Sequence, residues 1–269
     1  METGNEKQEK WYESMTIKMI LIAIMGLMLL IPLALISEVI RERSANADTA
    51  RKEIGALWAS AQTVTGPVLN VPGTRVISND GTFVTTTMHI LPDELKVNGV
   101  LEPEMRYRGI YETVVYDSDM EISGSLTIAG FEQLGDYTWE WDKAYISLGV
   151  SDNKGINDKA ELTIGEKVIG AIPGAGQTDL FDKGISFPYA IDPAKLSEAG
   201  GAFNIKLSLR GSGSVAFSPV GRNTEVALSS KWDAPSFTGN FLPAEREVTD
   251  AGFTANWVVT HLNRSFPQV

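Results

Sequence analysis

The chain contains no cysteine and only two histidines, His89 and His261, among its 269 residues. The missing cysteines exclude thiol nucleophiles, thiolate metal sites and disulfides together. The patterns G-x-S-x-G and H-E-x-x-H are also missing, and the two histidines do not stand at metal-ligand spacing. We therefore expect a protein that is not an enzyme and holds no metal or cofactor, with both histidines as packing or surface residues.

Basic residues are in the minority. Lys and Arg total 23 against 34 Asp and Glu, which gives a formal net charge of −11 at pH 7. A surface this acidic repels nucleic acid and anionic lipid headgroups. We therefore expect no nucleic-acid partner for the body of the protein.

Long apolar runs are limited to one, Met19 to Ser37, which carries no charged side chain. As a helix it would be about 28 Å long at ~1.5 Å per residue, close to the ~30 Å hydrocarbon core of a bilayer. A cleaved signal peptide is the weaker alternative, because the run is long and charged residues separate it from the small-residue motif Ala45-Asn46-Ala47. We predict a transmembrane helix whose partner, through Met19 to Ser37, is the lipid bilayer.

Four segments follow along the chain. Residues 1–18 are a polar head, predicted to be cytoplasmic, and residues 19–37 are the transmembrane helix. Apolar residues at three- and four-residue spacing predict a juxtamembrane helix over residues 38–65, stopped by Thr65-Gly66-Pro67. Residues 66–269 are the predicted periplasmic β-rich domain. Basic residues flank the transmembrane run almost evenly, so this orientation rests on the short head and the large acidic body.

The domain after residue 66 consists of short segments rich in Val, Ile, Thr, Tyr and Phe, separated by Gly, Asn, Asp and Pro. In Glu121 to Ile128 apolar residues alternate with Ser and Thr, the pattern of a half-buried strand. Asn98-Gly99 is a hairpin dipeptide beside such a run. Many short strands with little helix between them predict a mostly β fold, an antiparallel sandwich or barrel.

Acidic residues offer one pattern that resembles a metal site. Asp117, Asp119 and Glu121 form D-x-D-x-E, like the start of a calcium loop, but Ile122 and Ile128 stand where that loop needs Gly and Glu. Residues spaced by two on a strand share a face, so we expect a solvated acidic face. Paired carboxylates could instead serve glycoside hydrolysis, although the sequence nominates no pair.

The stretch Gly221 to Glu247 is too dense in Gly, Pro and aromatic residues for a plain strand pair. Its aromatic residues either fill a corner of the core or line a concave surface, and physical chemistry alone favours the core. If they face solvent, this stretch becomes a binding surface. The candidate binding residues are Arg222, Asn223, Trp232, Phe237, Phe241 and Arg246.

The same stretch resembles the CreD family of bacterial inner-membrane proteins, with G-R-N, then W, then P-x-F-x-G-x-F-L-P and an R-E pair. The similarity extends backwards in order through Gly66-Pro67-Val68-Leu69, Arg108-Gly109-Ile110-Tyr111 and Val150-Ser151-Asp152, and forwards to Gly252-Phe253 and Trp257. Several matched residues are Gly, Pro or aromatic, types that shape a backbone rather than perform a reaction.

The resemblance implies an inner-membrane protein with a cytoplasmic N-terminus and a periplasmic domain, tied to cell-envelope integrity and induced by a two-component sensor system. It supplies no catalytic residues. Family members continue into further membrane helices, so we expect this chain, which ends at Val269, to be a portion or a truncated relative.

Residues and resemblance together predict a membrane-anchored domain that binds an envelope component or a protein partner without catalysis. Two alternatives remain: a hydrolase of envelope polymers that uses paired carboxylates, and a purely structural domain that packs on the missing C-terminal helices.

Overall fold

The computed structural model describes residues 15–76, 82–128, 130, 135–176, 180–192, 194–195, 200–264 and 267. Most of the predicted head, residues 1–14, lies outside them. The chain divides into two units, residues 1–50 and residues 51–269.

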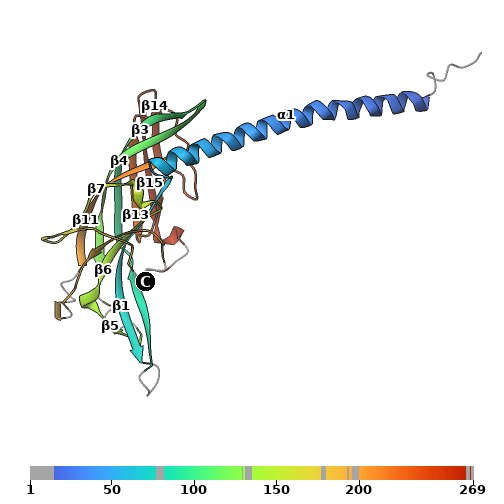
Figure 1. Ribbon diagram of the computed structural model, residues 1–269. Helices are drawn as coiled ribbons and strands as arrows, with labels where there is room; N and C mark the ends of the chain where they lie inside the picture. Colours follow the sequence, from blue (N-terminus) through green and yellow to red (C-terminus); the bar gives the residue numbers. More distant parts are fainter. Residues whose placement is uncertain are drawn as a thin grey trace, which may run out of the picture. The chain divides into compact units, whose positions relative to one another are not determined.

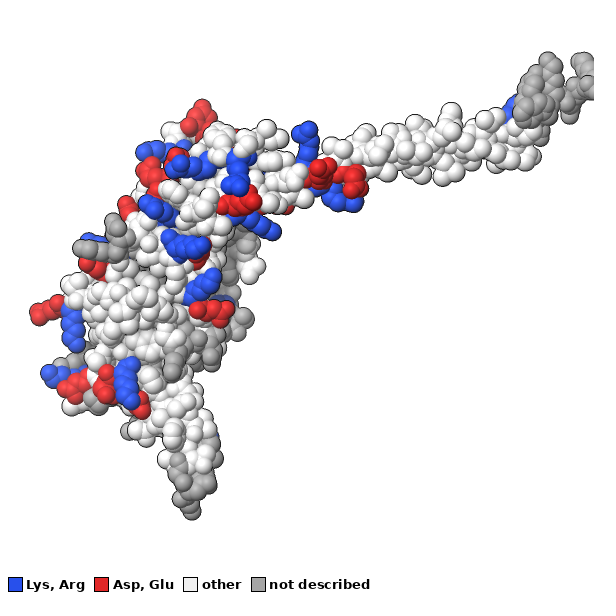
Figure 2. Space-filling model, viewed as in Figure 1, with Lys and Arg blue, Asp and Glu red and all other residues white. Residues whose placement is uncertain are grey.

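The first unit consists of most of α1, a single helix from Met15 to Leu57 that continues through Pro32 (Figure 1). The predicted transmembrane run lies inside it, and no residue of its most apolar window is buried. Figure 2 shows this stretch without Lys, Arg, Asp or Glu. Its length and composition are therefore those of a membrane span.

The predicted juxtamembrane helix is correct up to Leu57 and wrong at its end. Residues 62–65 belong to strand β1 (Gln62–Val76) and pair with two neighbouring strands. Gly66, at φ 114°, lies inside β1 at a shift of register rather than at a helix stop. The β-branched residues Thr63, Val64 and Thr65 therefore join a sheet, because tertiary pairing outweighs the weak helical spacing.

The first sheet contains seven strands in the order β12–β1–β6–β10–β9, with β2 and β5 also paired to the long β1. The pairing of β1 with β12 is parallel, and the others are antiparallel. Beyond the rest of the sheet, β1 and β2 continue as a two-stranded arm (Figure 1). The further strands are β2 Phe83–Ile90, β5 Thr138–Trp139, β6 Tyr145–Val150, β9 Ile172–Pro173, β10 Gly184–Pro188 and β12 Val215–Ser218.

The second sheet contains eight strands in the order β14–β15–β13–β3–β4–β11–β7–β8. Only the β13–β3 pair in it is parallel among the described pairings. Its strands are β3 Glu94–Arg108, β4 Tyr111–Thr127, β7 Ile156–Ile164, β8 Lys167–Gly170, β11 Gly200–Ser212, β13 Asn223–Ser230, β14 Glu245–Thr249 and β15 Gly252–Thr260. Short 3-10 helices span Trp141–Lys143, Asn153–Gly155 and His261–Asn263.

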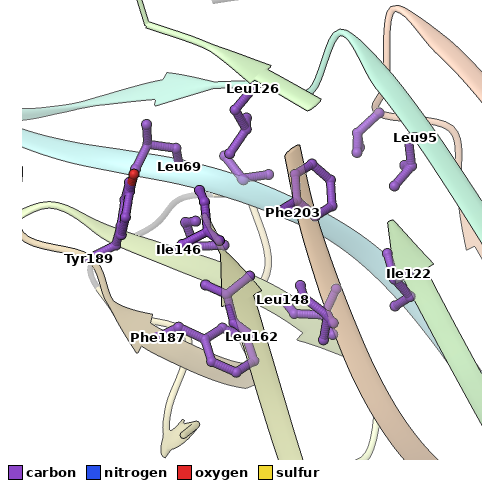
Figure 3. Packing of buried hydrophobic residues seen from close by; sticks show 14 of the residues in the cluster. Leu69, Leu95, Ile122, Leu126, Ile146, Leu148, Leu162, Phe187, Tyr189 and Phe203 are labelled. Carbon is purple, nitrogen blue, oxygen red and sulfur yellow. The ribbon is translucent and has the colours of Figure 1, made fainter. Parts of the chain in front are cut away.

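One hydrophobic core joins the two sheets (Figure 3). Leu69 and Leu148 come from the first sheet, and Ile122 and Leu162 come from the second; all four are fully buried. The alternation read from Glu121 to Ile128 places Ile122 inside, as expected for a strand with one wet face. The prediction of a mostly β, sandwich-type domain behind an apolar N-terminal helix is confirmed.

A buried glutamine connects β1 to strand β11 and to the loop after β6. Gln62 is 1% exposed, and its Nε2 donates to the carbonyl oxygens of Asp152 and Arg210 at 3.0 and 2.9 Å. Its Oε1 accepts from the backbone N–H of Asp152 at 3.2 Å. Beside it, the guanidinium groups of Arg106 and Arg210 lie over the ring of Trp58, at 5.1 and 4.7 Å. Long-range hydrogen bonds therefore fix the start of the sandwich.

The carboxylate of Asp152 supports the same junction. It accepts from the backbone N–H groups of Ser60 and Lys154, at 3.0 and 3.2 Å. Partial burial alone would raise the pKa of Asp152, but these hydrogen bonds and the Lys154 charge together hold that pKa below its ordinary value. The charged form is therefore the one that the folded domain favours.

Candidate functional site

The predicted aromatic stretch forms a loop, residues 231–244, between β13 and β14. Its first turn is fixed by Trp232, whose backbone N–H donates to Oγ of Ser230 at 3.2 Å. The indole Nε1 of Trp232 donates to the carbonyl oxygen of Ala234 at 2.9 Å. At the other end, the N–H of Ala244 donates to the carbonyl oxygen of Asn256 at 2.8 Å. The loop is thus tied to the strands at both ends.

Phe237 holds the middle of this loop against β15. Its ring meets Phe253 edge-on, with centroids 5.6 Å apart and planes at 84°. It meets Trp257 in a similar way, at 5.7 Å and 67°. The guanidinium of Arg246 lies 5.7 Å from the same ring centroid. Such edge contacts and cation–π contacts favour one position of the ring, and through it one position of the loop.

The loop covers a cavity of about 570 Å³. One wall is the inner face of β3, β4, β13 and β15 in the second sheet, and the opposite wall is β12 with its flanking residues. β12 is the last strand of the first sheet on this side, and residues 234–241 of the loop also line the cavity. The largest lining side chains are Leu101, Tyr116, Phe217, Leu228, Trp232, Phe237, Phe241, Phe253 and Trp257.

The lining is uncharged. None of the 26 described residues that line the cavity is Asp, Glu, Lys, Arg or His. The hydroxyl of Tyr116 donates to the carbonyl oxygen of Ser214 at 2.9 Å, so this donor is satisfied inside the protein. Burial raises the pKa of Tyr116 well above its ordinary value, against a smaller lowering by a backbone hydrogen bond from Gln62. Tyr116 therefore stays neutral, and the wall remains without charge at any physiological pH.

The structure separates the predicted binding residues into two groups. Trp232, Phe237 and Phe241 are half-buried and line the cavity. The preference for a core position is therefore wrong, because these side chains cover a space beyond the last strand of the first sheet. Arg246 contributes from outside, through the ring of Phe237.

Arg222 and Asn223 lie at the far end of β13 and do not line the cavity. Asn223 donates from Nδ2 to the carboxylate of Glu94 at 2.8 Å. The backbone N–H of Arg222 donates to the carbonyl oxygen of Pro92 at 2.8 Å, and its guanidinium lies 3.6 Å from the carboxylate of Asp93. Both residues connect β13 to the turn before β3, so their predicted grouping with Trp232 is not formed.

Four aromatic lining residues were not among the predicted candidates: Tyr116, Phe217, Phe253 and Trp257. A signal for two of them exists, since Phe253, Ala255, Trp257 and Val259 alternate along β15 and share the inner face. That pattern predicts an inward face, but not that the face borders open space.

The acidic residues of β4 lie elsewhere. Asp119 and Glu121 are exposed on the outer face of the second sheet, in a groove of about 620 Å³ whose described lining contains no aromatic residue. Asp117 accepts from Nε of Arg210 at 2.9 Å. The described residues contain no group of three or more His, Asp or Glu that could hold a metal. Asp119 and Glu121 therefore lie on a solvated acidic face, as predicted.

The histidines have separate surroundings. Nδ1 of His89 lies 2.7 Å from Oδ1 of Asn70, whose Nδ2 donates to Oγ of Ser147 at 2.7 Å. Asn70 and Ser147 are fully buried, so this hydroxyl is closed to solvent. His89 is half-buried in packing and His261 is exposed in a 3-10 turn, as predicted.

Comparison with known proteins gives one consistent result. A family model described as inner membrane protein CreD matches residues 14–269. The chain is 31% identical, over 237 residues, to the inner membrane protein CreD of Escherichia coli strain K12. The matched region covers 86% of this chain and 52% of that protein, so the chain spans about half the length of the curated relative it matches. No solved structure matches the chain.

Proposed function

The chain belongs to the CreD family of inner membrane proteins, and from this premise we propose that it is a membrane-anchored binding module of the cell envelope. In this proposal α1 holds the protein in the inner membrane and the β-sandwich lies in the periplasm. The cavity beneath loop 231–244 binds an envelope component, and this binding supports envelope integrity without catalysis.

The observation that carries the proposal is the cavity itself. A volume of about 570 Å³ is within the ~300–1,000 Å³ range of ligand sites, and such sites combine apolar and aromatic walls with a few polar groups. An empty apolar space also costs stability, because its lining loses packing contacts. The presence of such a space beside three half-buried aromatic side chains is better explained by ligand binding than by packing.

The alternative of a carboxylate hydrolase receives less support. That chemistry needs two carboxyl groups across a cleft, roughly 5–10 Å apart, with walls that hold a sugar. Among the described residues, the cavity with aromatic walls contains no carboxylate, and the groove with Asp119 and Glu121 contains no aromatic residue. The carboxylates and the aromatic walls that this chemistry needs together therefore lie in two separate sites.

Site-specific photocrosslinking tests the proposal. A benzoylphenylalanine in place of Phe241, a half-buried residue of the cavity wall, should capture envelope material in living cells. The same residue in place of Leu242, which is 67% exposed and does not line the cavity, is the matched control. Adducts at position 241 and not at position 242 support the proposal. Equal adducts at both positions, or none at 241, contradict it. In a longer family member that contains this domain, adducts to its membrane helices would favour the structural alternative.

Orientation is tested independently, because the natural absence of cysteine permits single-cysteine labelling. Asp250→Cys, at an exposed turn between β14 and β15, should react with a membrane-impermeant maleimide once the outer membrane is permeabilised. Lys7→Cys in the head should react only after the inner membrane is lysed. The reverse pattern would place the sandwich in the cytoplasm.

A further inference from the structure

Apolar and aromatic side chains line the interior of the cavity, and polar side chains lie at its rim. Two donors on its aromatic walls, the hydroxyl of Tyr116 and the indole N–H of Trp232, are already bonded to backbone carbonyl oxygens. The remaining polar lining includes Ser236, Thr238 and Asn240, which are exposed residues of the covering loop. A sugar or peptide would bury polar groups against this wall without partners, at high cost. A molecule with an apolar part inside and a polar part at the rim satisfies both regions.

The size of the cavity limits that apolar part. A methylene group occupies about the ~30 Å³ that a water molecule takes in the liquid, so 570 Å³ holds roughly 19 such groups. One hydrocarbon chain of a membrane lipid has about this volume. Two chains side by side would need about twice the space.

The source of such chains is the membrane to which the domain is tied. Only residues 58–61 separate the end of α1 from β1, and the junction is fixed by the bonds of Gln62 and Asp152. In the proposed function the apolar run from Met19 to Ser37 lies in the bilayer, and α1 continues from it to Leu57, so the sandwich is tethered to that membrane. Tethering raises the effective concentration of lipid chains over that of any soluble apolar molecule.

We propose that the cavity holds a single hydrocarbon chain of a membrane lipid, with the headgroup at the rim formed by loop 231–244. This inference rests on the proposed function, since it names the envelope component. Chain binding is driven by apolar burial, and its length limit is set by the cavity volume.

A chain-length series tests this inference on the full chain, purified from membranes and transferred to amphipol. The probes are saturated alcohols with a nitroxide at the terminal carbon, which quenches tryptophan fluorescence. Affinity should rise about fourfold per methylene from about eight carbons, because each buried methylene contributes ~0.8 kcal/mol. The rise should stop at about 19 carbons, where the cavity is full. Affinity that does not depend on chain length overturns the inference.

A matched pair of variants distinguishes binding of the probe in the cavity from its partition into the amphipol. Ser230→Asp places a charge on the cavity wall and keeps an acceptor for the N–H of Trp232. Ser229→Asp places the same charge one residue away, on the outer face of β13. The first variant should weaken binding at least tenfold and the second should leave it unchanged. Equal affinity in both variants shows partition into amphipol and refutes the cavity as the site.

A cavity-filling variant gives a readout that loss of folding cannot imitate. Ala234→Phe adds a ring to the lining without touching the carbonyl group that Trp232 uses, so the longest well-bound chain should shorten by several carbons. An unchanged length limit contradicts the inference.

The lipid source and the proposed function are tested apart. Organic extracts of the wild-type protein, but not of Ser230→Asp, should contain a lipid with its headgroup. Free fatty acid alone would overturn the membrane-lipid source. Peptide or glycan adducts at position 241, with a flat chain-length series, would overturn this inference and leave the proposed function standing. No adduct at position 241 would overturn the proposed function.

Discussion

Replacing Phe237 by alanine should release the loop that covers the cavity. The ring of Phe237 provides the contacts that hold the middle of the loop to β15, through the edges shared with Phe253 and Trp257. The substitution removes both edges and the cation–π contact of Arg246, so the hydrogen bond of Ala244 at the loop end loses the support of the middle of the loop and opens more often.

The expected loss can be worked from these contacts. A fully buried Phe→Ala change costs about 3–5 kcal/mol, so the half-buried Phe237 should lose about 2 kcal/mol from burial. The aromatic edges add about 0.5–1.5 kcal/mol each, partly overlapping with burial. A total of about 3 kcal/mol corresponds to roughly a hundredfold change in the equilibrium for local opening.

Hydrogen exchange measures that opening directly. The amide of Ala244, bonded to Asn256, should exchange roughly a hundredfold faster in Phe237→Ala. Amides of β13 inside the sheet, such as Val226, serve as the internal reference and should change little. Phe237→Leu keeps most of the apolar volume and loses the ring edges, so it should give an intermediate effect.

The outcome that refutes this reasoning is specific. If Phe237→Ala folds and exchanges at Ala244 as the wild type does, then Phe237 does not hold the loop. The cover of the cavity would then depend on the loop ends alone.

Three further substitutions test the packing and the junction. Gln62→Ala leaves the buried backbone partners of Gln62 unpaired, at a cost of about 1–3 kcal/mol each. A total loss of about 3 kcal/mol should lower the Tm measured by calorimetry by about 6–12 °C. A shift below about 2 °C would contradict the role given to these hydrogen bonds. Asp152→Asn should lower Tm near neutral pH, and the difference in Tm between wild type and variant should shrink as pH falls below about 4. The reason is that a pKa lowered by folding contributes stability only above the pKa of the unfolded chain. A difference in Tm that grows in acid would contradict this sign. Gly124→Ala should destabilise the domain by more than ~1 kcal/mol in denaturant unfolding, because an added Cβ would overlap a carbonyl oxygen of β3. Gly170→Ala should be neutral, because no atom lies within 4 Å of the Cβ that it would add. Equal effects of the two substitutions would contradict this packing.

Local patterns in the sequence predicted the type of those elements whose structure depends only on neighbouring residues. The apolar run from Met19 to Ser37 is a helix suited to a bilayer, since its length and composition require no partner to be recognised. The alternation from Glu121 to Ile128 predicted which side chains face inward, because a strand has a fixed period of two. The density of aromatic residues in loop 231–244 likewise marked a special region, although not its purpose.

Pairing between distant segments decided the rest. Residues 62–65 follow directly on a segment with helical spacing, yet they pair with β6 and β12, strands that lie some 85 and 150 residues further along the chain. The parallel neighbour of β13 is β3, so that Leu228 and Leu101 reach one cavity from far apart in sequence.

The cavity itself is a product of where the sheets end. The composition of Met1 to Val269 determines an apolar anchor and a strand-built acidic domain, because hydrophobic period and charge are properties of neighbouring residues. Only the tertiary structure makes β12 the last strand of its sheet, places it around one cavity with the inner faces of β13 and β15, and brings Phe237 to the lining of that cavity. Aromatic side chains that would have filled a core in a closed sandwich therefore line an opening.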